Sequence, residues 1–180
     1  MTMGNRIVVI NQGVVQQEGA PLALYREPVN LFVAGFLGSP AMNFVSGRLK
    51  KDGDKIRFCE TEGGTIEVAF PADEGTAAHG FAGKDVVLGI RPEDLKVANV
   101  SRREGKAAGT GFRAIIDSVE PMGAETNLYL QTGAHTLICR TQNAFDHREA
   151  GHRLQFEIDP GKAHLFDPVS TRRLGQELGP

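Results

Sequence analysis

The hydrophobic pattern at the start of the chain predicts a strand, a tight turn and a second strand. Residues 7–10 form a continuous run of β-branched side chains, which is typical of a buried strand. Residues 11–13 fit the turn, and Val14 and Val15 resume the strand pattern. A strand this apolar normally has neighbours on both sides, and folded domains seldom open on one.

The residues that follow predict two short helices. Pro21 fits the first turn of a helix, and Pro28 ends it. Asn30 fits the N-cap of a second helix that reaches Phe36, and Gly38 fits its end. A short α/β segment is therefore expected to open the chain.

Beyond this segment the pattern changes to short strands. Polar and apolar side chains alternate with a period of two at 55–58, 66–70 and 154–158, and the more continuous apolar runs 86–90 and 137–139 predict buried strands. Turn-rich gaps separate the runs at hairpin spacing, and no long helix is predicted between them. The expected fold class is mainly β, an antiparallel barrel or sandwich rather than βαβ units.

Charge is distributed unevenly, which suggests a domain boundary. The first 43 residues carry only four charged side chains, and all the others fall in the remainder of the chain. A segment so poor in charge is suited to being covered, whereas the rest has an ordinary solvated surface. We therefore divide the chain into residues 1–40 and 41–180.

Two gaps in the β region have the composition of loops. Residues 72–83 are rich in small side chains, and residues 101–109 are polar. The second loop divides the β region into halves at about 44–100 and 110–168.

Composition limits the function classes. With 180 residues, 41% hydrophobic and 23% charged, the chain has the composition of an ordinary soluble protein. Its net charge of −2 offers no basic field for a nucleic acid. Cys59 and Cys139 are far apart and lack metal-ligand spacing, which favours two reduced thiols. A cytoplasmic location is expected, because neither a leader nor an apolar run of membrane length is present.

The sequence contains no recognisable catalytic constellation. A phosphate-binding P-loop needs Ser or Thr after its Gly-Lys pair, and the pairs at 83–84, 105–106 and 161–162 are followed by Asp or Ala. His147 and His152 could contribute to a weak metal site, but a solvated polar loop is the favoured interpretation. No catalytic, nucleotide-binding or metal-ligating residue is therefore predicted.

The stretch 91–94 is the strongest candidate for an interaction. A buried strand runs into Arg91, which Pro92 keeps extended, and Glu93 and Asp94 are expected to form a single helical turn. The Arg91 guanidinium is suited to a bidentate pair with one of these acids or with an acid on a facing surface. The favoured interpretation is a strand-end turn held by a salt bridge, and the alternative is an interface anchor.

Several stretches resemble a known family, the ATPase subunits of ABC-type importers. Residues 1–44 resemble the end of the nucleotide-binding domain in this family. The stretches "LGIRPEDL" (88–95), "VEPMGAETNLYL" (119–130) and "KAHLFD" (162–167) resemble successive landmarks of its carboxy-terminal regulatory domain, an OB-like (TOBE) β-barrel. The resemblance is to sugar importers of the maltose and glycerol-3-phosphate class.

The resemblance implies that the chain is a fragment that does not itself hydrolyse ATP. In the family, the neighbours of the strand at 6–10 and all nucleotide-binding motifs lie upstream. The implied parent is a translocase subunit that uses ATP and Mg²⁺, lies at the cytoplasmic face of the membrane and binds transmembrane permease subunits. The family's OB-like domain helps hold two ATPase subunits together and in some members receives a regulatory protein. A homodimer is therefore expected, with a regulatory protein as a further partner.

Two other functions stay open at this point. Related barrels in some transporters bind oxyanions such as molybdate, and Lys50, Lys51 and residues 46–48 offer a weak version of such a site. A nucleic-acid-binding OB fold is disfavoured, because the chain has no Trp, only two Tyr and a slightly acidic balance. We also expect self-association through the regulatory face, the apolar segment 6–36, or both.

Overall fold

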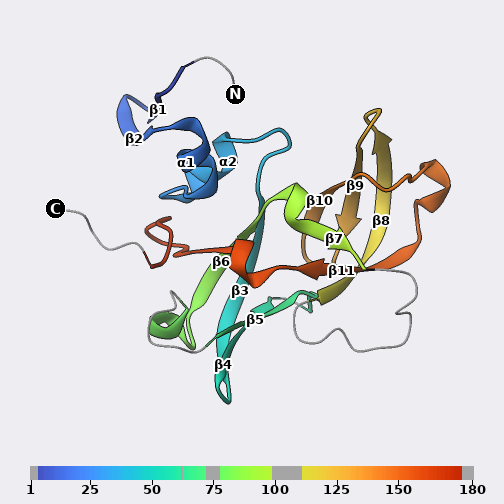
Figure 1. Ribbon diagram of the computed structural model, residues 1–180. Helices are drawn as coiled ribbons and strands as arrows, with labels where there is room; N and C mark the ends of the chain where they lie inside the picture. Colours follow the sequence, from blue (N-terminus) through green and yellow to red (C-terminus); the bar gives the residue numbers. More distant parts are fainter. Residues whose placement is uncertain (1–3, 62, 72–77, 99–110, 176–180) are drawn as a thin grey trace.

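The computed structural model describes residues 4–61, 63–71, 78–98 and 111–175 (Figure 1). Most of the chain forms two β-sheets that close around one core, and a small unit of a hairpin and two helices lies beside them. The prediction of a mainly β, antiparallel fold with a short α/β segment at its start is confirmed.

The opening hairpin consists of β1 (Ile7–Asn11) and β2 (Val14–Gly19), which pair antiparallel as predicted. Its two turn residues, Gln12 and Gly13, both have positive φ, at 50° and 80°. This is the backbone of a type I′ turn, whose twist matches that of the flanking strands. Gly13 adopts the conformation without cost, which is why the turn forms at this point.

The two helices also form as predicted. In α1 (Pro21–Arg26) the proline occupies the first turn, where its missing N–H costs no hydrogen bond. In α2 (Leu31–Phe36) the Asn30 side chain accepts a hydrogen bond of 2.9 Å from the Val33 N–H and caps the helix.

Ten strands form the two sheets, and all neighbouring strands are antiparallel. The β3 sheet has the order β12-β6-β3-β4-β5, with the bounds His164–Phe166, Asp85–Ile90, Asn43–Asp52, Lys55–Glu60 and Glu67–Pro71. The β8 sheet has the order β10-β9-β8-β11-β7, with the bounds Thr136–Thr141, Thr126–Gln131, Gly111–Pro121, Arg153–Ile158 and Leu95–Val97. Short 3₁₀ turns connect some strands: η1 (His79–Phe81), η2 (Pro92–Asp94), η4 (His147–Glu149) and η5 (Pro160–Lys162).

Each of the two halves that the sequence suggested contributes one strand to the sheet formed mainly by the other half. From the first half, β7 joins the β8 sheet and pairs with β11, with Val97 opposite Phe156. From the second half, β12 joins the β3 sheet and pairs with β6, with Leu165 opposite Leu88. The expected loop 101–109 lies outside the described residues, and the described part of the loop 72–83 contains η1.

One hydrophobic core fills the space between the sheets. Alternate residues of β3, β4 and β6 face it from one side, and those of β8, β9 and β11 from the other. Its largest side chains are fully buried: Phe58, Phe112, Phe156, Leu49, Ile56, Ile66, Leu88, Ile90, Leu95 and Ile116. The rings of Phe112 and Phe156 stack with their centroids 5.5 Å apart.

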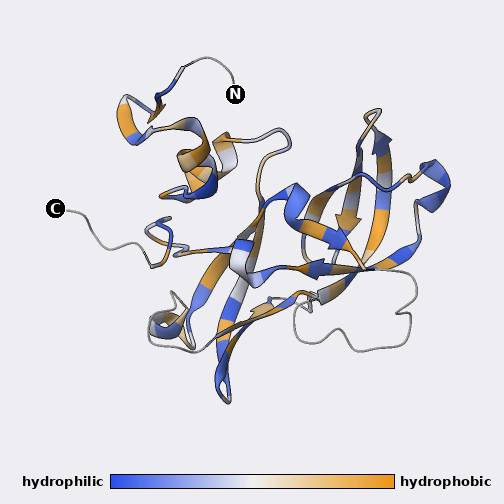
Figure 2. Cartoon of the chain, viewed as in Figure 1, coloured by the Kyte–Doolittle hydropathy of each residue, from blue (hydrophilic) through white to orange (hydrophobic). Residues whose placement is uncertain are grey.

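The opening unit has a small core of its own, formed by Val9, Leu24, Val33 and Leu37. A two-stranded hairpin and two short helices cannot cover all their apolar side chains. Six of these side chains are exposed: Val8, Ile10, Val14, Val15, Leu22 and Phe36. Figure 2 shows the apolar colouring of this hairpin on the outside of the molecule.

Candidate functional site

Arg91 lies at the point where the barrel meets the opening unit. It follows β6, and Pro92 keeps its backbone extended before η2 begins. The residue is only 3% exposed. Its guanidinium donates from Nη1 to the carbonyl oxygens of Ala34 (3.2 Å) and Leu37, and from Nη2 to that of Tyr25 (2.7 Å).

The prediction that Arg91 pairs with an acid is therefore wrong. All the hydrogen bonds that its guanidinium makes within the described residues go to carbonyl oxygens at the ends of α1 and α2. The last carbonyls of a helix have no partner within the helix and carry partial negative charge, so a buried cation satisfies them. Arg91 therefore caps both helices at once.

Tyr25 completes this contact, and its role was not predicted from the sequence. The Arg91 guanidinium carbon lies 3.8 Å from the centroid of the Tyr25 ring, at cation–π distance. The Tyr25 hydroxyl donates a hydrogen bond to the Glu93 carboxylate. Burial and this hydrogen bond raise the pKa of Tyr25 to about 12, so the hydroxyl remains a donor at neutral pH.

The remaining residues of the predicted stretch also make contacts. Pro92 is buried, and Glu93 and Asp94 lie in η2 as the sequence predicted. Asp94 forms an ion pair with Lys162 of η5 at 2.8 Å. Residues 91–94 thus contact the opening unit on one side and the segment before β12 on the other.

A second attachment joins the opening unit to the last described residues. The Leu31 N–H donates to the Thr171 carbonyl and the Arg173 N–H donates to the Val29 carbonyl, and the donor–acceptor distance is 2.9 Å in both. The Leu174 N–H then donates to the Leu165 carbonyl of β12 at 2.8 Å. The start of α2 is therefore tied to the barrel through backbone hydrogen bonds.

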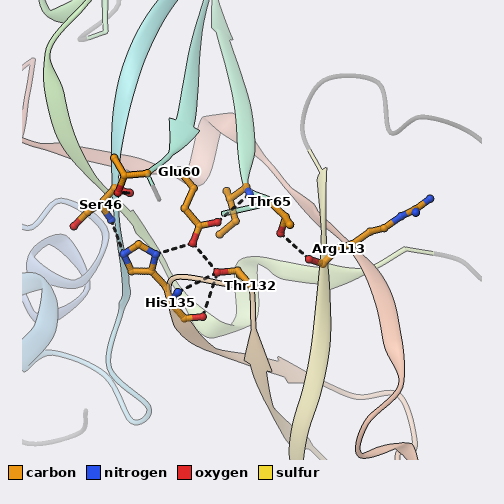
Figure 3. Close-up of polar contacts among 8 residues, drawn as sticks. Ser46, Glu60, Thr65, Arg113, Thr132 and His135 are labelled. Atoms are coloured by element: carbon orange, nitrogen blue, oxygen red, sulfur yellow. Dashed lines mark hydrogen bonds and ion pairs between the residues drawn. The ribbon is translucent and has the colours of Figure 1, made fainter. Parts of the chain in front are cut away.

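A buried polar network joins the two sheets (Figure 3). The Glu60 side chain at the end of β4 is completely buried. Its carboxylate accepts hydrogen bonds from the Thr132 hydroxyl (2.6 Å), the His135 ring Nδ1 (2.6 Å) and the Ile66 N–H (3.1 Å). Three donors compensate for the burial of this charge.

The hydrogen-bond partners of His135 indicate its tautomer. Its Nε2 accepts from the backbone N–H of Ser46 at 3.1 Å, so this nitrogen carries no proton. The proton then lies on Nδ1 and is donated to Glu60. Nearby, the Thr65 hydroxyl donates to the Arg113 carbonyl at 2.7 Å and adds another contact between the sheets.

A hollow of about 610 Å³ lies over the β3 sheet. Ser46, Gly47, Arg48 and Lys50, the residues considered for an oxyanion, are part of its lining, whereas Lys51 is not. Asp85 also lines the hollow and pairs with Arg48 at 2.7 Å. Glu60 lines the hollow as well, so an anion there would meet two acidic residues beside the two cations.

The two cysteines and the histidines of the loop before β11 have the following surroundings. Cys59 and Cys139 are both free thiols. Cys139 is buried and donates to the Leu95 carbonyl, and burial raises its pKa to about 12. His152 contacts Glu149 at 2.9 Å on an exposed turn. The described residues contain no group of three or more potential metal ligands.

The helices of the described part of the chain are too short or too polar to cross a membrane.

Comparison with protein families divides the chain at this junction. Residues 38–95 match the MalK OB fold domain, and residues 88–166 match the TOBE domain. The two matches overlap at 88–95, the stretch that contains Arg91 and η2.

Known relatives match nearly the whole chain. The trehalose/maltose import ATP-binding protein MalK of Thermococcus litoralis is 35% identical over 175 residues, 97% of this chain and 45% of that protein. The sn-glycerol-3-phosphate import ATP-binding protein UgpC of Burkholderia cenocepacia has the same identity and coverage. The chain is homologous to ABC-importer ATP-binding subunits of the MalK and UgpC type. It carries OB and TOBE domains.

A third relative and one solved structure are also similar to this chain. The ABC transporter ATP-binding protein y4oS of Sinorhizobium fredii is 38% identical over 174 residues, 97% of this chain and 42% of that protein. The chain thus spans less than half the length of these relatives. The cytoplasmic molybdate-binding protein ModG shares the fold, with a TM-score of 0.52 and 14% identity over 70% of this chain and 96% of ModG.

Proposed function

We propose that the chain is the regulatory and dimerisation region of the ATP-binding subunit of a carbohydrate importer. The observation that carries the proposal is the pair of domain matches, to the MalK OB fold and to TOBE, in one continuous stretch from residue 38 to 166. The two relatives named as import proteins for trehalose/maltose and sn-glycerol-3-phosphate support a substrate of the carbohydrate class.

In this proposal, ATP and Mg²⁺ bind elsewhere in the whole subunit. The printed sequence contains no P-loop, and we expect the 180-residue chain to have no ATPase activity. The subunit would lie at the cytoplasmic face of the membrane against permease subunits, and a regulatory protein is a further partner. The barrel would keep two subunits together between rounds of ATP hydrolysis, because a persistent contact raises the local concentration of each partner.

The exposed apolar side chains of the opening unit are one surface through which two chains can associate. Val8 and Ile10 on β1 and Val14 and Val15 on β2 are all about half exposed or more. A two-stranded hairpin also has free strand edges, which favour pairing with another chain. The regulatory face of the barrel is the other candidate surface.

Size-exclusion chromatography with light scattering tests the dimer. We expect the 180-residue chain to elute as a dimer, and Val14→Lys to weaken it if the hairpin is the contact surface. Val169→Lys is the matched control, because Val169 is 92% exposed on a turn of the barrel. A monomer at concentrations of about 100 µM would contradict the proposed dimerisation, since functional interfaces of standard size bind more tightly than this.

A second candidate function is oxyanion binding in the hollow over the β3 sheet. The Lys50 ammonium makes no hydrogen bond or ion pair within the described residues, and Ser46 and Arg48 lie in the same lining. Asp85 opposes this function, because it already neutralises Arg48. Calorimetry with molybdate and sulfate distinguishes the candidates: binding that Lys50→Gln abolishes would favour the oxyanion site.

A further inference from the structure

The opening unit and the barrel have separate apolar cores. The core of the unit lies around Leu24 and Val33, and the core of the barrel lies between its sheets. Among the described residues, a small cluster of Ala34, Met42 and Phe166, with a few partly buried neighbours, bridges the two. A shared hydrophobic core is therefore too small to fix the orientation of one part on the other, and directional contacts must contribute.

Arg91 provides such directional contacts. Its planar guanidinium points from the end of β6 into the opening unit and meets carbonyls of α1 and α2 in different directions. Hydrogen bonds from a charged donor are stronger than neutral ones and strongly oriented. Because the residue is 3% exposed, no bulk water is available to replace a lost carbonyl partner.

The other attachments hold a different part of the unit. The backbone hydrogen bonds to Thr171 and from Arg173 involve residues 29–31, at the start of α2. Arg91 instead holds Tyr25 near the end of α1, and Ala34 and Leu37 at the end of α2. Arg140 also donates to the Ser39 carbonyl just beyond α2, but Arg91 holds the ends of both helices at once.

We infer that Arg91 is a positioning residue that prevents the helices at 21–37 from pivoting on the barrel and couples their movement to β6 and η2. The inference rests on the proposed function, in which the opening unit moves with the ATPase part of the whole subunit. The Tyr25 hydroxyl bonded to Glu93 and the ion pair of Asp94 with Lys162 extend the rigid connection through η2 to η5. A displacement of α1 or α2 is thus transmitted to η2, in the middle of the barrel sequence, and to η5, shortly before β12.

Hydrogen exchange measured by mass spectrometry on the 180-residue chain tests this inference. In Arg91→Met, which keeps most of the apolar stem, amides of residues 21–37 should exchange at least about tenfold faster, since several charged hydrogen bonds are lost. Amides of β3, β4 and β8 should exchange at the wild-type rate. Arg91→Lys should restore part of the protection, because an ammonium can still reach a carbonyl.

Two controls make the result specific. Arg48→Met removes an exposed arginine of β3, paired with Asp85, and should leave residues 21–37 unchanged. Tyr25→Phe deletes only the bond to Glu93 and should accelerate exchange at 21–37 by a smaller factor. If Arg91→Met does not fold, Tyr25→Phe and Arg91→Lys carry the test.

The inference would be overturned if residues 21–37 exchanged at the wild-type rate in the Arg91 variants. If Arg91→Met does not fold, wild-type exchange in both Tyr25→Phe and Arg91→Lys would overturn it. Equal acceleration in both the helices and the barrel would also overturn it, because Arg91 would then contribute only to general stability. The test of the proposed dimerisation is independent of this one. Light scattering measures the dimer, whereas hydrogen exchange at residues 21–37 can be measured on a monomer.

Discussion

The Glu60 carboxylate and the His135 imidazole lie 2.6 Å apart, on the β3 sheet and in the turn before β10 of the β8 sheet (Figure 3). The contact joins the two sheets through a buried charge that three donors satisfy. Breaking one side of such an arrangement leaves an uncompensated polar group in the interior, which is more costly than the loss of a surface contact.

Glu60→Gln should therefore lower the free energy of unfolding by about 2 kcal/mol. The new amide NH₂ would face the donors Thr132 and His135, or the Ile66 N–H, and one of these would lose its acceptor. Urea unfolding followed by circular dichroism measures the change.

The matched control for Glu60→Gln is Glu67→Gln on β5. Glu67 is exposed and pairs with Arg57 at 3.2 Å, so this variant should change stability by less than about 0.5 kcal/mol. Equal destabilisation by both substitutions would show that the buried network has no special role.

Asn43 closes the edge of the barrel with its side chain. Its amide donates to the Ile138 carbonyl (2.8 Å) and accepts from the Ile138 N–H (2.7 Å), so it replaces a missing strand neighbour of β10. We expect Asn43→Ala to destabilise the protein by about 2 kcal/mol and to accelerate exchange of the Ile138 amide. Asn143→Ala, at an exposed position, is the control and should have little effect on either measurement.

His164 gives the stability a defined pH dependence. Burial, with Arg173 and Arg91 nearby, lowers its pKa to about 4 in the folded protein, from an ordinary value of 6.5. Between these values the unfolded chain binds a proton that the folded protein does not, so this contribution is complete above pH 6.5 and decreases as the pH falls toward 4. Its size between pH 7 and pH 5 is up to about 2 kcal/mol.

Urea unfolding at pH 7 and pH 5, for the wild type and His164→Gln, measures this contribution. The variant should lose part of the pH dependence, because it lacks the imidazole whose pKa burial lowers. Identical pH dependence in the two proteins would exclude His164 as its source.

Gly47 on β3 has no Cβ, and the Phe58 ring packs against its backbone in the space that a Cβ would occupy. A Cβ at this position would lie 2.6 Å from the Cys59 carbonyl oxygen and would overlap the Phe58 ring. Gly47→Ala should therefore destabilise the protein by about 2–3 kcal/mol through overpacking. Gly80→Ala on η1, where no atom lies within 4 Å of the added Cβ, should be nearly neutral in the same thermal or urea unfolding experiment.

The local elements could be predicted because their signals lie in adjacent residues. The hairpin turn, the Pro21 and Asn30 helix starts and the period-two strands all depend on backbone preferences over a few positions. The importance of Arg91 could be predicted for the same reason, from a buried strand that runs into an arginine. Its partners could not, since they are carbonyls brought together only when α1 and α2 pack on the barrel.

The buried network was missed, although one part of it left a signal. Glu60 continues the inward-facing alternation of Ile56 and Phe58 on β4, and a charged side chain at a core position indicates a buried partner. Its partners Thr132 and His135 come from a distant turn, and nothing in their neighbourhood distinguishes them from ordinary turn residues. The strand exchange likewise depends on topology and not on local pattern.

The exchange of β7 and β12 between the sheets has a consequence for biosynthesis. β6 is complete at residue 90, but its neighbour β12 is not translated until residue 166. Likewise, β7 at 95–97 acquires its partner only with β11 at 153–158. Pairings this distant in sequence form slowly and late. A nascent chain therefore leaves the ribosome with both sheets incomplete, and the barrel closes only after nearly all of its residues have been made.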